Sequence, residues 1–373
     1  MDGMWQAEIR VDLDAIRHNV ALLRARTSAE VMAVVKADGY GHGMVPVARA
    51  ALSAGATWLG VCTLDEALAL RAAGITAPVL AWLLAPGLPL HHGVAAGVDL
   101  SAATTALLGE LVAAARTAGR PARVHLKLDT GLNRGGAKPA DWSSLVEAAA
   151  KAQADGTIEV VGVWSHFARA DEVGHGSIDA QLSAFRDGLD TAGRYGLSPR
   201  YRHLANSAAA LTRPDSHFDL VRAGIASYGL SPIPGQGFGL RPAMTVRARV
   251  LLAKRVAPGE GVSYGHTYTT GTETTLAVVP LGYGDGVPRH GSNVGPVWLH
   301  GRRRTVAGRV CMDQIVLDCG DDPVSAGDVA VLFGPGDHGE PTADDWADAV
   351  GTINYEIVTR MSAARVARVY DGE

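Results

Sequence analysis

Short apolar runs alternate with alanine- and leucine-rich helical stretches over the first 240 residues, and this alternation constrains the fold more than any other feature. Strands that alternate with helices form right-handed βαβ units and a parallel sheet. Eight such units in about 200 residues predict closure into a TIM-type (β/α)8 barrel, with an open doubly wound sheet as the alternative. The expected strands are Val31–Lys36, Trp58–Thr63, Pro78–Leu84, Val98–Ala102, Arg123–Asp129, Glu159–Phe167, Arg202–Asn206 and Phe218–Ile225.

The sequence pattern changes near Arg241, where short strand-like runs are separated by glycine and proline turns. We therefore expect an α/β chain with a barrel over residues 1–240 and a mainly β domain over 241–373; a short first strand, Ala7–Asp12, is a candidate to pack with the second domain. Helices are expected at 342–350 and 354–361, before Arg365–Tyr370. The expected strands of the second domain are Thr245–Val256, Thr275–Pro280, Val297–His300, Thr305–Val310, Gln314–Asp318 and Asp328–Phe333.

Composition excludes several classes of protein. The 373 residues, 47% of them hydrophobic, suffice for a sizeable core, and a formal charge of −4 with interspersed signs offers no basic stripe for nucleic acid or membrane. Residues 1–17 lack the apolar segment of a signal peptide, and no apolar run reaches the roughly 20 residues of a membrane span. Cys62, Cys311 and Cys319 indicate neither a disulfide framework nor a zinc site, so we expect a cytoplasmic protein without metal.

One lysine ends the first barrel strand. Lys36 follows an apolar run and precedes a glycine-spaced loop that presents Tyr40 and His42. Desolvation lowers the pKa of a lysine at such a position, and Schiff-base chemistry uses the neutral amine. Taken alone, a strand-end lysine more often reaches out to solvent or to a neighbour such as Asp38.

Further polar residues lie at the ends of later strands, where barrel enzymes place their chemistry. Arg134 follows the fifth strand, His166 ends the sixth, Asn206 and Ser207 end the seventh, and Arg222 lies in the eighth. Each has an ordinary explanation by itself: a surface charge, a core histidine, a helix N-cap, a partner for Asp219. Their coincidence with Lys36 at one face predicts an active site.

An anion site is expected beside the last two strands. Backbone N–H groups of Ser207, Gly224 and Ile225 would form the cradle for phosphate that barrels place there. A phosphorylated aldehyde bound to Lys36 would be pyridoxal 5′-phosphate. A sugar-phosphate or aldolase-type Schiff-base barrel meets these requirements equally well.

The motifs resemble those of the alanine racemases, pyridoxal-phosphate enzymes of the fold-type III group, over nearly the whole length. The motifs that carry the resemblance are 33–43 (AVVKADGYGHG), 129–134 (DTGLNR), 203–207 (HLANS), 221–230 (VRAGIASYGL), 262–267 (VSYGHT), 282–286 (GYGDG) and 308–313 (GRVCMD).

The resemblance implies the roles of the site residues. Lys36 binds the cofactor aldehyde, and Tyr264 of a partner chain in a head-to-tail homodimer is the second base. The implied phosphate-binding residues are Tyr40, Ser207, Gly224, Ile225 and Tyr355; His166, Asn206 and Arg222 also line the cofactor site, and Arg134, Tyr283, Met312 and Asp313 line the substrate site.

Racemisation requires two bases, because a proton leaves one face of Cα and another arrives at the opposite face. A phenol of pKa near 10 is about 0.1% ionised at pH 7, so Tyr264 needs neighbours that favour phenolate. The resemblance implies that these neighbours are Arg134 and His166, and that His166 connects towards Arg222. Arg222 has only donors, so opposite the pyridine nitrogen it would leave that nitrogen unprotonated and weaken the electron sink.

Three further expectations come from the resemblance. Lys127 matches a lysine that is often carbamylated; the ordinary alternative is a lysine paired with Asp129. Tyr264, Tyr283, Tyr355 and Met312 narrow the pocket to suit alanine, with serine a slow substrate. The product, D-alanine, would supply peptidoglycan.

The alternatives to alanine racemase are a broader or serine-type racemase, a non-catalytic pyridoxal-phosphate-binding protein and a decarboxylase of the same barrel. The non-catalytic pyridoxal-phosphate-binding proteins lack the β domain. The decarboxylases use a cysteine from the partner chain, a role that Cys311 could mimic, although we interpret Cys311 as structural.

Overall fold

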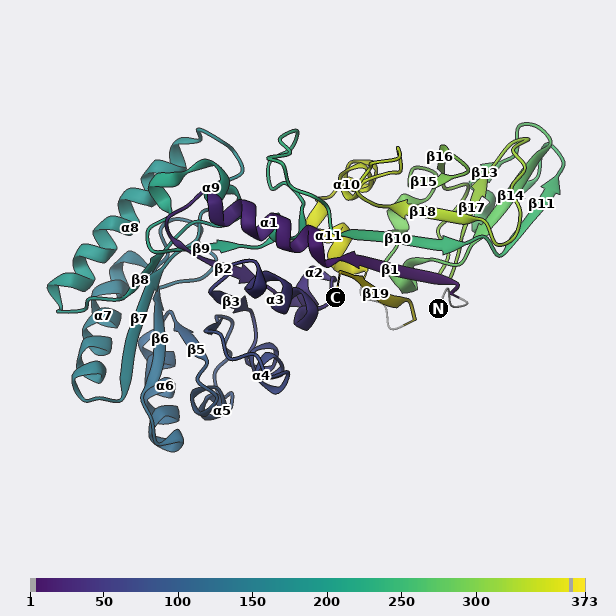
Figure 1. The fold of residues 1–373 in the computed structure, drawn as a ribbon. Helices are drawn as coiled ribbons and strands as arrows, with labels where there is room; N and C mark the ends of the chain where they lie inside the picture. Colours follow the sequence, from purple (N-terminus) through teal and green to yellow (C-terminus); the bar gives the residue numbers. More distant parts are fainter. Residues whose placement is uncertain (1–4, 362–364, 373) are drawn as a thin grey trace. The chain divides into compact units, whose positions relative to one another are not determined.

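The computed structural model describes residues 5–361 and 365–372 of the chain. They divide into two compact units: residues 17–39 and 44–240 form one, and the described residues up to Ile16, residues 40–43 and those from Arg241 onward form the other. Figure 1 shows the elements of both. No helix in these described ranges is both long and apolar enough to cross a membrane.

The larger unit is an eight-stranded parallel barrel, which confirms the prediction. Its strand order is β8-β7-β6-β5-β4-β3-β2-β9. Hydrogen bonds from Asp219 N to Arg202 O (3.1 Å) and from Arg222 N to Ala205 O (2.9 Å) join β9 to the region of β8 and nearly close the ring. The strands are β2 (Glu30–Val34), β3 (Trp58–Val61), β4 (Val79–Ala81), β5 (Asp99–Ala102), β6 (Ala122–Lys127), β7 (Ile158–Trp164), β8 (Tyr201–His203) and β9 (Leu220–Ala223).

Helices alternate with the barrel strands, and some of them begin or end at capping residues. Thr63 and Glu66 form a capping box at the start of α4, and Gly119 ends α6 in the left-handed conformation. The helices are α1 (Leu13–Ala25), α3 (Met44–Ser53), α4 (Leu64–Ala72), α5 (Leu90–Ala95), α6 (Thr105–Ala118), α7 (Pro139–Ala154), α8 (Gly176–Arg194) and α9 (Ser207–Thr212), with 3-10 turns η1 (Pro214–Ser216) and η2 (Ile225–Tyr228).

The second unit is mainly β. A six-stranded sheet has the order β16-β15-β18-β10-β1-β19; β11, β14 and β17 form a second sheet, and β12 and β13 a hairpin. Strand β1 (Ala7–Asp12) runs antiparallel to β10 and parallel to β19. The other elements are β10 (Met244–Arg249), β11 (Leu252–Val256), β12 (Gly261–Val262), β13 (Tyr268–Thr269), β14 (Thr274–Val279), β15 (Pro296–Leu299), β16 (Arg302–Thr305), β17 (Ile315–Asp318), β18 (Val329–Phe333), β19 (Ala367–Asp371), α10 (Ala343–Val350), α11 (Asn354–Arg360), and 3-10 turns η3 (Tyr264–His266), η4 (Tyr283–Asp285) and η5 (Arg289–Gly291).

Two strand predictions in this unit are wrong. The run Thr245–Val256 is two strands in different sheets, because the chain leaves β10 at Val250 and Leu251 to pair with β14. The run Thr305–Val310 begins where strand β16 ends. Its apolar residues belong to the core, whereas β16 consists of charged residues: it lies at a sheet edge, where its arginines form ion pairs such as Arg303–Asp345 (3.1 Å).

Candidate active site

The side chains predicted for the active site lie at the carboxyl ends of the barrel strands. Lys36 follows β2 after one residue, His166 follows β7, Ser207 begins the helix after β8, and Arg222 lies in β9. Arg134 lies in the loop between β6 and α7 and is exposed. One end of the barrel therefore collects the predicted basic groups.

Arg222 is a buried guanidinium held by barrel acceptors. Its Nη1 donates to His203 O (2.9 Å) and contacts His203 Nδ1 (3.1 Å), while Nη2 donates to Ser165 O (2.8 Å) and Leu204 O (3.1 Å). Burial lowers the pKa of Arg222 to about 9, which leaves it charged at neutral pH. Asp219, the ordinary partner considered from sequence, instead pairs with Arg202 at 2.7 Å.

His166 is a neutral neighbour of that guanidinium. Its Nδ1 lies 3.2 Å from Arg222 Nη2. Burial, reinforced by the charges of Arg222 and Arg134, holds the pKa of His166 well below its usual value. The imidazole can therefore accept a hydrogen bond from Arg222.

Two cations lie against the ring of Trp164. Lys127 Nζ lies 4.3 Å from the centre of its ring and Arg222 Cζ lies 4.8 Å from it. Burial, followed by the charges of Arg222 and Arg134, lowers the pKa of Lys127 to about 8. Asp129, the alternative partner of Lys127, accepts hydrogen bonds from the backbone of Gly131 and Leu132 and so shapes the loop that carries Arg134.

A cavity of about 330 Å³ adjoins Lys127. Its walls are largely apolar and include Trp82, Leu84, Leu107, Lys127 and Gly136. The lysine amine thus borders a space large enough for a small added group.

Asn206 and Ser207 join the ends of β8 and β9. Asn206 caps α9 through a hydrogen bond from Ala209 N to its Oδ1 (3.1 Å), which confirms the ordinary explanation for this residue. Ser207 Oγ accepts hydrogen bonds from Gly224 N (2.9 Å) and Ala226 N (3.3 Å). The predicted anion site therefore has its residues together, although the N–H of Gly224 points to the serine hydroxyl.

The loop after Lys36 is a left-handed turn that the sequence did not reveal. Ala37, Asp38 and Tyr40 all have φ near +52°, a conformation that costs roughly 1–2 kcal/mol for each residue other than glycine. Glu66 stabilises it: one carboxylate oxygen accepts from Ala37 N (2.7 Å), and the other from Cys62 N (2.8 Å). The capping residue of α4 thus also fixes the turn that begins at Lys36.

Within the second unit, the structure brings together two of the predicted phosphate-binding tyrosines. The ring centres of Tyr40 and Tyr355, on α11, lie 6.4 Å apart. The same unit carries the exposed side chains predicted to reach a partner: Tyr264 is 71% exposed, Met312 54% and Tyr283 40%.

Backbone contacts join the loops that carry those exposed residues. Tyr283 N donates to Cys311 O and Gly284 N to Met312 O, each at 2.9 Å. Ser263 Oγ donates to Arg309 O (2.7 Å) and lies 3.3 Å from Cys311 Sγ, so the thiol packs inside this junction. Asp313 pairs with Arg365, which also binds Asp285. We call these joined loops, residues 263–266, 282–286 and 309–313, the β-domain tip.

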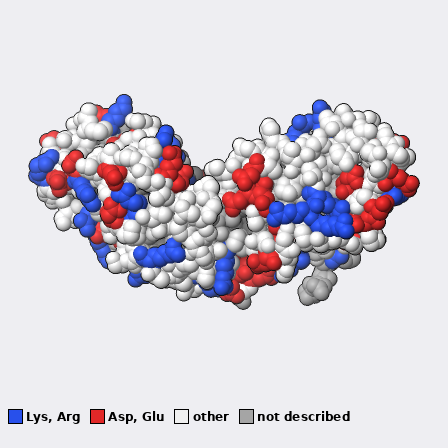
Figure 2. All heavy atoms as spheres, turned by 90° about the horizontal axis from the view of Figure 1, so that it is seen from above, with Lys and Arg blue, Asp and Glu red and all other residues white. Residues whose placement is uncertain are grey.

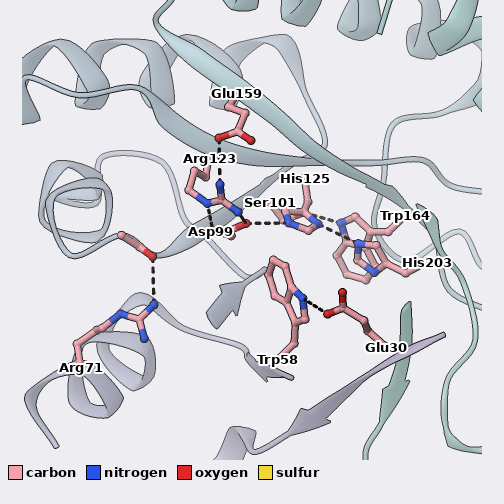
Figure 3. A network of polar contacts seen from close by, with 11 residues as sticks. Glu30, Trp58, Arg71, Asp99, Ser101, Arg123, His125, Glu159, Trp164 and His203 are labelled. Carbon is pink, nitrogen blue, oxygen red and sulfur yellow. Dashed lines mark hydrogen bonds and ion pairs between the residues drawn. The ribbon is translucent and has the colours of Figure 1, made fainter. Parts of the chain in front are cut away.

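Sequence reasoning missed a buried polar cluster inside the barrel. Asp99, His125 and His203 are at most 1% exposed and contact one another in a row (Figure 3). The available signal was a histidine between two apolar residues of β6, Val124 and Leu126, because a barrel interior tolerates a polar residue only with partners.

Charge and metal-ligand patterns add no second candidate. Figure 2 shows acidic and basic side chains interspersed on the face in view. Among residues 5–361 and 365–372, no group of three or more histidine, cysteine, aspartate or glutamate side chains is placed to hold a metal ion.

The fold defines a (β/α)8-barrel enzyme with a second, mainly β domain, and the candidate site collects lysine and arginine side chains at one end of the barrel. Comparisons with known proteins give the particular family. Residues 11–232 match the family model "Alanine racemase, N-terminal domain", and residues 243–370 match "Alanine racemase, C-terminal domain". The chain belongs to the alanine racemase family.

Close relatives cover the whole chain. An alanine racemase of Salinispora arenicola is 73% identical over 370 residues, which span 99% of this chain and 100% of the relative. One from Thermobifida fusca is 62% identical over 98% of both chains. The crystal structure of alanine racemase from D-cycloserine-producing Streptomyces lavendulae superposes with a TM-score of 0.98 at 55% identity, covering 100% of this chain and 98% of that one.

Proposed function

We propose that this protein interconverts L-alanine and D-alanine by a two-base mechanism in a homodimer, with pyridoxal 5′-phosphate as cofactor. The chain is an isomerase that racemises alanine, in keeping with relatives of that name at high identity across its full length. The D-alanine formed would supply peptidoglycan synthesis. Its three cysteines are free, as is typical of the reducing cytoplasm, where we place the enzyme.

The observation that carries the proposal is the charged, donor-only Arg222 buried at the same barrel end as Lys36. The barrel residues fit pyridoxal phosphate: an amine for its aldehyde, a donor for its ring nitrogen, and Ser207, Gly224 and Ile225 for its phosphate. Bound there, the cofactor supplies the electron sink that acidifies the Cα–H bond of an amino acid. A guanidinium facing the ring nitrogen leaves it unprotonated, which favours racemisation over transamination.

Lys36 and Tyr264 would exchange protons with the two faces of Cα. The Lys36 amine serves one face, on the barrel's own chain. Tyr264, on the exposed tip of the β domain, serves the other face in a partner's barrel. His166, which is neutral, would accept the hydrogen bond of Arg222 and orient the tyrosine hydroxyl, while Arg134 favours its ionised form.

Tyr264, Tyr283 and Met312 would also restrict the substrate. Their large side chains would narrow the space beside Cα to that of a methyl group, so serine would react slowly. Asp313, held by Arg365, would position Met312 beside it.

We also propose that Lys127 carries a carbamate. Carbon dioxide adds to an unprotonated amine, and a pKa of about 8 makes that form accessible at physiological pH. The adjoining cavity has room for the added group, which as an anion would pair with Arg134. The mass of the intact protein in bicarbonate buffer tests the modification, and a mass equal to that of the unmodified chain would refute it.

The reaction is tested by incubating the pure protein, loaded with pyridoxal phosphate, with L-alanine in deuterated water. We expect D-alanine that carries deuterium at Cα and no release of carbon dioxide. Carbon dioxide release would favour the decarboxylase, and no exchange would favour a non-catalytic binding protein. Serine and larger amino acids in place of alanine test the breadth of the pocket.

Mixing two inactive variants tests the shared site. Lys36→Ala and Tyr264→Phe subunits, refolded together, would form mixed dimers in which one site carries both defects and the other carries none. About one quarter of wild-type activity should return if each site takes Lys36 and Tyr264 from different chains. No recovery, with mixed dimers present, would place both residues on one chain.

A further inference from the structure

Three buried polar side chains, Asp99, His125 and His203, contact one another in a row inside the barrel (Figure 3), and the mechanism above does not use them. His203 Nδ1 lies 3.1 Å from Arg222 Nη1, and His203 Nε2 lies 2.9 Å from His125 Nδ1. His125 Nε2 then lies 3.0 Å from Asp99 Oδ2. The row starts at Arg222 near the carboxyl end of β9 and finishes at Asp99, the first residue of β5.

The chemistry of its first member fixes the direction of every hydrogen bond in the row. A guanidinium has donors only, so His203 Nδ1 must accept from Arg222 and its proton must sit on Nε2. His203 Nε2 therefore donates, and His125 Nδ1 must accept. The proton of His125 then sits on Nε2 and is donated to the carboxylate of Asp99.

We propose that Asp99, His125 and His203 are positioning residues that hold both imidazoles neutral in one tautomer and thereby fix the orientation of Arg222. This role rests on the function proposed above, in which Arg222 faces the cofactor ring. The opposite tautomer would set an imidazole N–H against an N–H of the guanidinium, and Arg222 would have to turn away.

Neighbouring residues pack closely against the two imidazoles of this row. Gly162 pairs with His125 at a register irregularity between β6 and β7, and a Cβ on Gly162 would lie 2.3 Å from His125 Nδ1. The Trp164 indole stacks on His203 with an angle of 4° between the rings, and its Nε1 donates to Ser101 Oγ (2.9 Å). The imidazoles therefore have little freedom to rotate.

Charges at the far end keep Asp99 ionised. Burial alone would raise the pKa of Asp99, but its contacts with His125 and Arg123 outweigh burial and lower the pKa. Arg123 binds both carboxylate oxygens, at 2.8 and 3.2 Å, and its Nη1 reaches Glu159 at the surface (3.0 Å). Burial, with the charge of Arg222, also keeps the pKa of His203 well below its usual value.

The tautomers are measurable without cofactor or activity. Nitrogen-15 NMR of histidine-labelled, cofactor-free protein distinguishes protonation at Nδ1 from protonation at Nε2, and His125→Gln and His203→Gln variants assign the signals. We expect both imidazoles to be neutral with the proton on Nε2. A proton on Nδ1 of either ring, or a doubly protonated ring at pH 7, overturns the proposal even if the Asp99 variant misfolds.

Asp99→Leu should loosen the row. It removes the acceptor of the His125 Nε2 proton, so the Nε2 tautomers of the two rings lose the anion that favours them. A second tautomer should appear in both rings, and kcat of the loaded enzyme should fall about 10- to 100-fold with KM nearly unchanged. Glu159→Gln, which removes only the surface partner of Arg123, is the matched control and should change neither readout.

The outcomes separate the two proposals. Unchanged tautomers in Asp99→Leu, or changed tautomers with unchanged kcat, overturn the positioning role. If wild-type protein shows the expected tautomers and does not racemise alanine, the hydrogen-bond row stands and the proposed function fails.

Discussion

Arg222 and Tyr264 occupy opposite physical environments. Arg222 is 4% exposed, and barrel carbonyls and imidazoles hold its guanidinium, whereas Tyr264 is 71% exposed on a turn of the β domain. The barrel end is therefore organised within a single chain, because burial obliges each polar atom to find a partner. The β-domain tip presents its side chains to whatever approaches it. Variants at the two regions should consequently affect different properties.

The largest effect is expected at the barrel. Lys36→Ala should reduce racemisation by at least about a thousandfold, because no other amine follows β2 to bind the cofactor aldehyde. The absorbance of the bound cofactor and the exchange of the alanine Cα proton measure the loss. Lys138→Ala, at the exposed start of α7, is the control and should retain activity. Comparable activity in both variants would remove Lys36 from the site.

Tyr264→Phe should separate catalysis from stability. Removing an exposed hydroxyl should change the free energy of unfolding by less than about 0.5 kcal/mol. Loss of one base should nevertheless slow proton exchange from L-alanine by about 100-fold. Exchange from D-alanine should be slowed much less. Deuterium incorporation from each isomer measures the asymmetry; equal losses would contradict the assignment of one base to each face.

Gly282→Ala should disturb the β-domain tip. A Cβ at Gly282 would lie 2.4 Å from the carbonyl oxygens of Cys311 and Met312, so the loops that carry Tyr283 and Met312 would have to separate. We expect a loss of about 1–3 kcal/mol in stability, seen by denaturant unfolding, together with weaker racemisation. Gly271→Ala, where an added Cβ meets nothing within 4 Å, is the matched control. Equal stability of the two variants would mean that the loops are not held as described.

The smallest effect should come from Lys127→Met in buffer free of carbon dioxide. The pKa of Lys127 is about 8 in the folded protein, against an ordinary value of 10.5. Below pH 8 the lysine is protonated in both the folded and the unfolded protein, so the full cost of burying its charge lowers the stability. Between pH 8 and 10.5 the lysine is neutral in the folded protein but still protonated in the unfolded protein, so wild-type stability rises with pH. The methionine variant should therefore be roughly 1–2 kcal/mol more stable at pH 7, a gain that vanishes by about pH 10.5.

Unfolding in denaturant across this pH range measures that difference. Lys138→Met, at an exposed position, should show no such dependence. A constant difference between Lys127→Met and wild type at every pH would mean that the lysine does not titrate in this window.

The sequence predicted more of the barrel than of the β domain for a physical reason. Parallel strands buried on both faces tend to be apolar runs, so segments such as Val31–Val35 and Trp58–Val61 are visible in the sequence. Strand β16 is an edge strand of arginines whose stability depends on acidic residues distant in sequence, such as Asp345, and no local pattern marks it.

The same distinction applies to the site. Lys36, His166 and Arg222 stand out as polar residues that interrupt or end apolar strands. The row behind Arg222 could not be foreseen, because the contact of Asp99 with His125 depends on strand pairing and on the space that Gly162 leaves. The left-handed turn at Ala37–Tyr40 depends likewise on Glu66, a residue of another βα unit.

Strand β1 has a consequence for the order in which the protein forms during synthesis. Its neighbour β19 lies at the other end of the chain, and Arg10 pairs with Asp371 across 361 positions. The barrel strands, β2 to β9, are all made before any of the other strands that β1 joins. A growing chain can therefore complete the barrel while both edges of β1 are still unpaired. Contacts between residues so far apart in sequence also form slowly. Synthesis of β19, rather than completion of the barrel, should set the earliest time at which the six-stranded sheet is whole.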